Sequence, residues 1–282
     1  MEIIFLNLFL KKILILKHLI ATILLLNVFH TSSAQYTSLG AENYAMANSL
    51  VAFPNRTSIY NNPAGMSFFK ETSLGLSYFR VLPVEGFNTL GAWATTHKKG
   101  FSFGFSADSF GDQFYKESRA GLAISKKLDK VSMGLKFSIL NNKIEEVSSK
   151  QTFLGEFGII VTPHRFFNLG LHVVNFTRAS LYSSQDLPTI VSTGAILNLS
   201  KSARFSIQLD YPLNRKPELR TGLQYAVRPN LKLMTGINPV QKTVHFGLGG
   251  VFDNKSFDYA VATIPSVGLS HQFSLHYKIR GK

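Results

Sequence analysis

From residue 72 onward the chain alternates apolar side chains with polar or small ones at a period of two. Segment 101–106 alternates three phenylalanines with serine and glycine, and segment 131–139 alternates Val, Met, Leu, Phe and Ile with Ser, Gly and Lys. Successive side chains of a strand point to opposite faces, so each run predicts a strand with one apolar face and one polar or small face. A helix would repeat its apolar positions about every 3.6 residues, and these runs lack that period.

Fourteen such runs are predicted, and most have the roughly 9–11 residues that a tilted strand needs to cross a bilayer. The runs cover 72–79, 88–96, 100–108, 118–126, 130–141, 151–162, 166–175, 189–199, 203–211, 218–227, 231–238, 243–252, 256–263 and 269–279. Their even number and their length predict an all-β fold, a closed antiparallel transmembrane β-barrel of about 14 strands.

The connections between these strands alternate in length. If the N-terminus lies in the periplasm, the inward turns are 97–99, 127–129, 163–165, 200–202, 228–230 and 253–255, and the longer outward connections include 80–87, 109–117, 142–150 and 176–188. Bacterial outer-membrane barrels have short periplasmic turns and longer outer loops. A soluble β-sandwich, the alternative, has no reason to alternate its turn lengths, so the pattern favours the barrel.

The first 34 residues have the order of a secretory signal peptide. Three lysines between residues 11 and 17 precede a mostly apolar run over 19–29, and the small residues Ser32 and Ala34 suit a cleavage site. A retained membrane anchor is the alternative, but the lysines interrupt the roughly 20 apolar residues that a spanning helix needs. We therefore predict a signal peptide at 1–34, an N-terminal segment at 35–71 and a barrel at 72–282, placed in the cell outer membrane.

Composition supports a membrane barrel and limits its partners. Charged residues make up 16% of the chain, below the roughly 25% of soluble domains, and the absence of cysteine excludes thiolate sites. The net charge is +14, of which residues 1–34 contribute +2. An excess of basic turns has two interpretations: an anionic partner such as lipopolysaccharide or an acidic protein, or simply basic turns on a membrane protein. The scattered charges and the lack of a motif argue against nucleic acid.

The N-terminal segment resembles the start of FadL-type barrels. The pattern is a predicted short helix over 41–51, then Ser58-Ile59-Tyr60 and Asn62-Pro63-Ala64-Gly65-Met66, then the first strand. The resemblance implies that 35–71 is a plug inside the barrel, with Asn62, Pro63, Ala64 and Gly65 as the plug motif, and that the protein carries a small hydrophobic compound. The chain is shorter than a FadL-type transporter, which makes it more similar to the compact PorV/PorQ-type branch associated with type IX secretion.

The inward faces of the predicted strands hold most of the candidate site residues. The lumen-lining candidates are Lys136, Glu156, His172, Asp210, Arg220, Gln224, Lys232 and His245. No histidine has metal-ligand spacing, no G-x-S-x-G is present, and the glycine-rich segment 247–250 lies within a strand pattern. We therefore expect no catalytic residue, metal or cofactor, and no enzyme activity.

Two functions remain after these exclusions. The first is transport of a small hydrophobic compound across the outer membrane, with the plug in its path. The second is a non-transporting barrel that serves as an accessory or docking subunit of a protein-secretion system of type IX kind. An apolar cavity behind the plug would favour the first, and a filled lumen with an apolar ridge beyond the lipid belt would favour the second.

Overall fold

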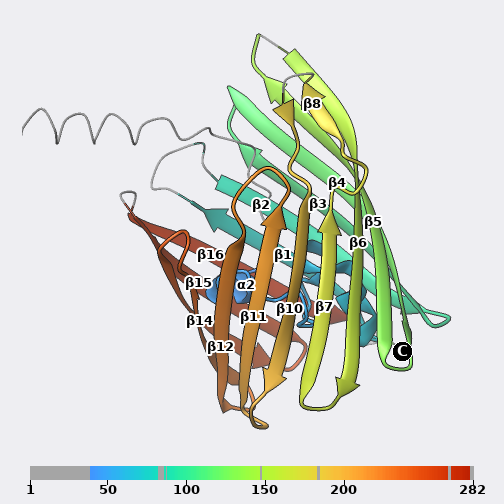
Figure 1. The fold of residues 1–282 in the computed structure, drawn as a ribbon, viewed down its shortest axis with the longest axis vertical. Helices are drawn as coiled ribbons and strands as arrows, with labels where there is room; N and C mark the ends of the chain where they lie inside the picture. The colour runs from blue at the N-terminus through green and yellow to red at the C-terminus, as the bar shows by residue number, and fades with distance from the viewer. Residues whose placement is uncertain are drawn as a thin grey trace, which may run out of the picture. The chain divides into compact units, whose positions relative to one another are not determined.

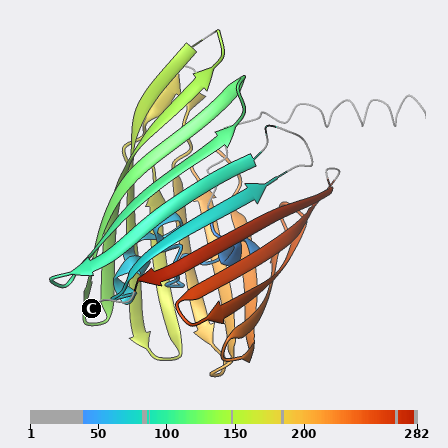
Figure 2. The same ribbon diagram turned by 180° about the vertical axis from the view of Figure 1, so that it is seen from behind.

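The computed structural model describes residues 39–81, 86, 88–146, 148–182, 185–265 and 268–279. Fourteen antiparallel strands form a closed barrel, in which β1 pairs with both β2 and β16. Figure 1 shows the strands around the blue helix α2, and Figure 2 shows the cyan N-terminal strands beside the red C-terminal ones. The predicted fold is confirmed. The predicted signal peptide lies outside the described residues.

The observed strands correspond one to one with the predicted runs. They are β1 Thr72–Arg80, β2 Asn88–Lys98, β3 Phe101–Gly111, β4 Tyr115–Leu128, β5 Val131–Ile144, β6 Ser148–His164, β7 Phe167–Val174, β10 Ile190–Asn198, β11 Ala203–Pro212, β12 Glu218–Arg228, β13 Leu231–Asn238, β14 Thr243–Phe252, β15 Lys255–Ile264 and β16 Gly268–Ile279. Consecutive strands pair throughout, and a separate hairpin, β8 Ser180–Tyr182 with β9 Gln185–Asp186, interrupts the connection between β7 and β10.

The short turns have the geometry that a two-residue hairpin requires. Lys99 and Gly100 join β2 to β3 with φ of 51° and 79°, and Asp129 in the next such turn has φ of 50°. Turns with positive φ match the right-handed twist of the strands they connect. The alternating turn lengths in the sequence therefore reflect real hairpin geometry at one end of the barrel.

Two of the predicted outer loops are wrong. Most of 109–117 and 142–150 belongs to strands. The pairing of β3 with β4 continues until Gly111 is opposite Lys116, and the pairing of β5 with β6 continues until Ile144 is opposite Ser148. β6 has 17 residues, more than a bilayer crossing needs. Both faces of these extensions carry polar residues, so no continuous apolar face marks them as strands in the sequence. Figure 1 shows the tips of the green strands β5 and β6 reaching beyond those of β12 and β14.

The two faces of the barrel wall differ as the alternation predicts. Along β1, Leu74, Leu76 and Tyr78 are 45%, 54% and 44% exposed on the outer face, whereas Ser73 and Ser77 are buried. Lipid covers such an apolar outer band in a transmembrane barrel. No helix among the described residues is long and apolar enough to cross a bilayer.

The outward face gives the first prediction. Leu135 lies on the outer face of β5 and is 38% exposed. We expect Leu135→Arg to lower the free energy of unfolding by about 2–4 kcal/mol, as a basic residue on the lipid face near the midplane does, and Leu135→Ala to cost less. Reversible denaturant unfolding of the barrel in phospholipid vesicles measures both. Equal losses for the two variants would contradict a lipid-facing position.

The segment before β1 folds into three short helices inside the barrel. They are α2 Ala41–Ala45, α3 Ser58–Asn61 and the 3-10 helix η1 Pro63–Phe68. The predicted helix over 41–51 is too long, because Ala47 and Asn48 have φ of 53° and 58°, which a right-handed helix does not allow. We refer to residues 39–69 as the inner segment. Its first part packs on β13 to β16 and its last part on β3 to β6.

Candidate functional site: the filled lumen

The inner segment is buried almost completely by the barrel wall. Leu39, Met46, Leu50, Ile59 and Tyr60 are at most 1% exposed. A barrel of about eight strands is filled by its own side chains, while one of 16–18 leaves an aqueous channel. A wall of 14 strands with many small inward residues therefore leaves room for a chain segment, and the inner segment occupies it.

Inward glycines let the inner segment approach the wall. A Cβ on Gly134 would lie 2.5 Å from the backbone nitrogen of Ala64, and one on Gly170 would lie 2.5 Å from the carbonyl oxygen of Val51. Real Cβ atoms do not come so close to backbone, so these positions accept only glycine while the segment is in place. An arginine at Gly134 would therefore displace the inner segment instead of entering an open lumen.

The plug motif forms a tight buried turn against the wall. The side-chain amide nitrogen of Asn62 donates to the backbone carbonyls of Val51 (2.7 Å), Ile159 (3.3 Å) and Leu171 (3.2 Å). Its amide oxygen accepts from the backbone nitrogen of Ala64 at 3.1 Å, across Pro63 at the first position of η1. Asn62 thus links the inner segment to β6 and β7. Position 65 requires glycine, because a Cβ added to Gly65 would collide with Ser58, at 2.3 Å from its hydroxyl oxygen.

Wall serines hold the rest of the inner segment. The hydroxyls of Ser67 and Ser132 are 2.6 Å apart, and those of Ser49 and Ser206 are also in contact. The backbone nitrogen of Ala41 donates to the hydroxyl of Ser274 at 2.9 Å. These bonds satisfy backbone and side-chain polar groups that would otherwise be buried without partners.

The structure places all eight lumen-lining candidates on the inward face and divides them into groups. In the first group, the Lys136 ammonium lies 3.1 Å from one oxygen of Glu156, and His172 Nε2 lies 3.2 Å from the other. All three side chains are at most 3% exposed. Lys136 and Glu156 are directly opposite each other on β5 and β6.

A second group lies on β11 and β12. The guanidinium of Arg220 binds Asp210 at 2.9 Å and Glu218 at 3.0 Å. Glu218 also accepts from Asn238 on β13 at 3.0 Å. His245 is separate from both groups: its Nε2 is 2.9 Å from the hydroxyl of Thr243, and its ring packs edge-on against Tyr44 of α2.

The third group joins the inner segment to the wall at the short-turn end. Lys232 Nζ lies 2.6 Å from Glu42 and 2.9 Å from Asp258, and Gln224 donates to the same Glu42 oxygen at 2.9 Å. Sequence reasoning missed Glu42 and Asp258. The shared face of Asp258, Ala260 and Ala262 was the only signal that Asp258 points inward.

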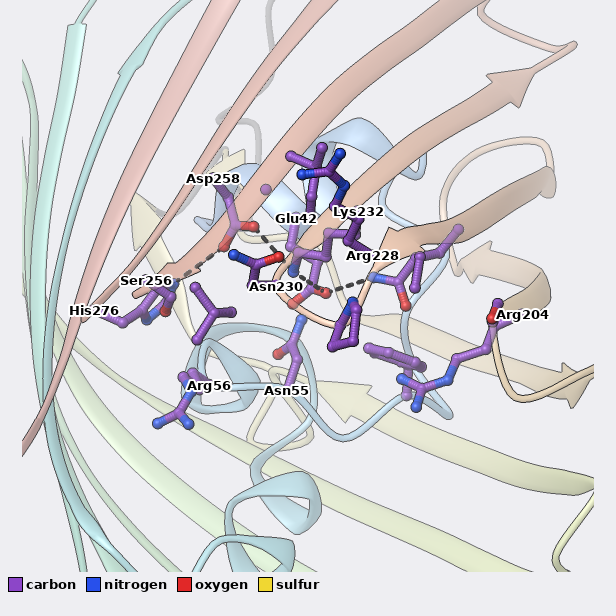
Figure 3. Close-up of a pocket in the computed structure, with 18 of the residues that line it drawn as sticks. Glu42, Asn55, Arg56, Arg204, Arg228, Asn230, Lys232, Ser256, Asp258 and His276 are labelled. Atoms are coloured by element: carbon purple, nitrogen blue, oxygen red, sulfur yellow. Dashed lines mark hydrogen bonds and ion pairs between the residues drawn. The ribbon is translucent and has the colours of Figure 1, made fainter. Parts of the chain in front are cut away.

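A cavity of about 270 Å³ opens beside this third group. Its lining includes the short turns at 201–202 and 228–230, so it lies at the short-turn end of the barrel. Figure 3 shows Glu42, Lys232 and Asp258 connected on one side of it, with Asn55 and Arg56 of the inner segment on the opposite side. Among the described residues, no group of three or more His, Cys, Asp or Glu side chains could hold a metal ion.

Comparisons with known proteins identify the fold and not the sequence family. No family model matches the chain, and no curated protein is similar to it in sequence. In structure it is similar to the toluene transporter TbuX of Ralstonia pickettii (10% identity, TM-score 0.67, covering 86% of this chain and 99% of that one). It is also similar to the monoaromatic hydrocarbon channel CymD (11%, 0.68, 88% and 100%) and to the toluene transporter TodX of Pseudomonas putida (12%, 0.62, 87% and 99%).

These solved structures are FadL-family hydrocarbon transporters with a 14-strand barrel. The resemblance to FadL-type barrels that the N-terminal motif suggested is therefore confirmed at the level of the fold.

Proposed function

We propose that the protein is an outer-membrane barrel that carries a small hydrophobic compound across the outer membrane, with the inner segment as its plug. The observation that carries this proposal is the combination of an apolar outer face with a lumen filled by one continuous chain segment. The fold shared with toluene and monoaromatic hydrocarbon transporters supports the same class of compound. Lipopolysaccharide in the outer leaflet would surround the outer band.

Passage through this barrel requires the inner segment to move. The buried inner segment occupies the interior of the barrel, and hydrogen bonds hold it to the wall from Ala41 to Ser67. Because the sequence contains no cysteine, one engineered disulfide can lock the segment without side reactions. The touching hydroxyls of Ser49 and Ser206 mark a suitable pair of positions.

We expect cells expressing the protein to take up toluene faster than vector controls, and the variant Ser49→Cys with Ser206→Cys to lose this gain when oxidised. Reductant should restore it, because the same barrel is then unlocked. The measurement is the initial rate of uptake at matched amounts of protein in the outer membrane. Uptake no faster than in vector controls would contradict the transport proposal, and equal rates for oxidised and reduced variants would show that the segment need not move.

One observation favours the second candidate function, a docking or accessory barrel of the PorV type. The long hairpin β3–β4 ends in an exposed aromatic tip, where Phe114 is 62% exposed and Tyr115 is 37% exposed. Such an exposed aromatic tip suits contact with a secretion subunit. Under this alternative Phe114→Ser would lower the mass of the native complex on a blue-native gel without changing toluene uptake.

A further inference from the structure

The cavity at the short-turn end carries an excess of positive charge that passage of a neutral compound does not use. Five basic and two acidic side chains line it. Lys232 is neutralised by Glu42 and Asp258. The three remaining lining cations on the wall have no carboxylate partner among the described residues; they are Lys201, Arg204 and Arg228.

The cavity also contains a buried donor without a partner. Asn55 is 4% exposed, and its amide oxygen is used within the inner segment, where it accepts from the backbone nitrogen of Thr57 at 3.1 Å. Among the described residues, its side-chain amide nitrogen has no hydrogen-bond partner. Figure 3 shows the Asn55 side chain directed into the space below Glu42 and Asn230. Buried polar groups are normally paired, so this nitrogen indicates a missing acceptor at the cavity.

Part of the remaining lining is apolar. Phe53, Phe69, Leu231 and Val251 contribute to it, and the guanidinium of Arg204 lies 5.2 Å from the ring centroid of Phe53. Guanidinium and amide donors bind carboxylates with charge-assisted hydrogen bonds. The apolar part of the lining would contact the remainder of a bound molecule, and hydrogen bonds beside such low-dielectric surroundings are stronger than in water.

We propose that this cavity is a binding site for a small organic anion, a carboxylate on a compact apolar body. The Asn55 amide and the Arg228 guanidinium bind the carboxylate, and the phenylalanines contact the apolar body. Lys201, in the turn between β10 and β11, adds a further positive charge to the lining, which attracts anions. The site is independent of the proposed transport, since it holds whether or not the barrel carries a compound.

The protein contains its own reporter for this site. Trp93 is the only tryptophan and is 3% exposed on the inward face. Its indole nitrogen donates to the carbonyl of Arg56 at 2.9 Å, and its ring lies 5.2 Å from that of His276. Both Arg56 and His276 line the cavity, so a bound molecule changes the surroundings of the indole.

The test is a titration of Trp93 fluorescence in the purified full chain with benzoate, at constant ionic strength. Benzyl alcohol has nearly the same shape without the charge and is the matched comparator. We expect a saturable change with benzoate and an apparent Kd about tenfold lower than for benzyl alcohol, since hydrogen bonds to a charged group are about that much stronger. Equal affinity for the two, or no saturable change with benzoate, would overturn the proposal.

Three variants test whether the fluorescence change arises from benzoate bound in the cavity. Asn55→Asp keeps the oxygen that accepts from Thr57 but replaces the free donor by an acceptor, and Arg228→Gln removes an exposed guanidinium at a turn. Each should weaken benzoate binding about tenfold. Lys130→Gln changes the charge equally in a short turn outside the cavity and should leave the affinity unchanged. If Lys130→Gln weakens binding as much as Arg228→Gln, general attraction and not a site explains the response, and the proposal fails.

Discussion

Replacing Glu156 by glutamine is expected to destabilise the folded barrel by about 3–5 kcal/mol, the cost of removing one partner of a buried ion pair. Lys136 is 0% exposed, and its ammonium lies 3.1 Å from Glu156. The ring of Tyr60 also lies close to this ammonium, with its centroid 5.2 Å away. Without the carboxylate, the lysine must either remain charged without a counter-ion or give up its proton, and both lower the free energy of unfolding.

The double variant Lys136→Met with Glu156→Gln should recover more than half of this loss. Removing both charges removes the uncompensated one, and a methionine of similar length fills the same space. Lys278→Gln is the matched control, because Lys278 is 44% exposed and lies 3.9 Å from Glu71; exposed pairs contribute about 0–1 kcal/mol. Reversible unfolding in phospholipid vesicles measures all four proteins. A double variant no more stable than Glu156→Gln would show that the ion pair is not what the single variant disrupts.

Deleting residues 37–60 is expected to convert a closed barrel into a conducting pore. The deletion removes α2 and most of the buried apolar side chains of the inner segment, including Leu50 and Ile59. The inward face that remains carries many serine, glycine and charged residues, which water wets readily, beside apolar ones such as Ile160 and Ile196. The strands lose no pairing partner, because the barrel closes through β1 and β16, so the shortened protein should still insert.

Planar-bilayer conductance compares the deletion variant with the protein that retains the segment. We expect frequent, large conductance steps from the deletion variant and few from the other. The control is the oxidised disulfide between positions 49 and 206, which should stay closed because the segment cannot leave the lumen. If the deletion variant is as closed as the control, the wall side chains fill the lumen by themselves, and the inner segment is not the plug.

The unfolding experiment on Glu156 tests the stability of the barrel wall, and the conductance experiment on the deletion variant tests the role of the inner segment. The Lys136–Glu156 pair lies on neighbouring strands β5 and β6 and would persist in a barrel without a plug. The Glu42–Lys232 pair, by contrast, joins the segment to the wall and is lost with the deletion. A variant that conducts with an intact wall therefore identifies the inner segment as the element that closes the barrel.

Strand identity and the direction of each side chain could be predicted from the sequence. The alternation over 131–139 placed Leu135 outward and Lys136 inward, as the structure has them. Successive side chains of a strand point to opposite faces, so in a barrel wall the apolar positions face lipid and the polar or small positions face the lumen. The same reasoning placed Glu156 and His172 inward. It failed where both faces are polar, as at the tips of β3 to β6, since no apolar face then marks the strand.

Only the tertiary structure decided which inward residues meet. Lys232 and Asp258 lie on β13 and β15, with Gly249 of β14 in register between them. Their side chains cross above this glycine, where a Cβ would lie 2.2 Å from Asp258. That contact depends on the register of three strands at once and on Glu42 from a distant segment, whereas alternation describes one strand at a time. The path of residues 39–69 through the lumen could likewise not be predicted from the sequence. It depends on contacts with inward glycines and serines of the wall, and the sequence does not show which part of the segment each of them contacts.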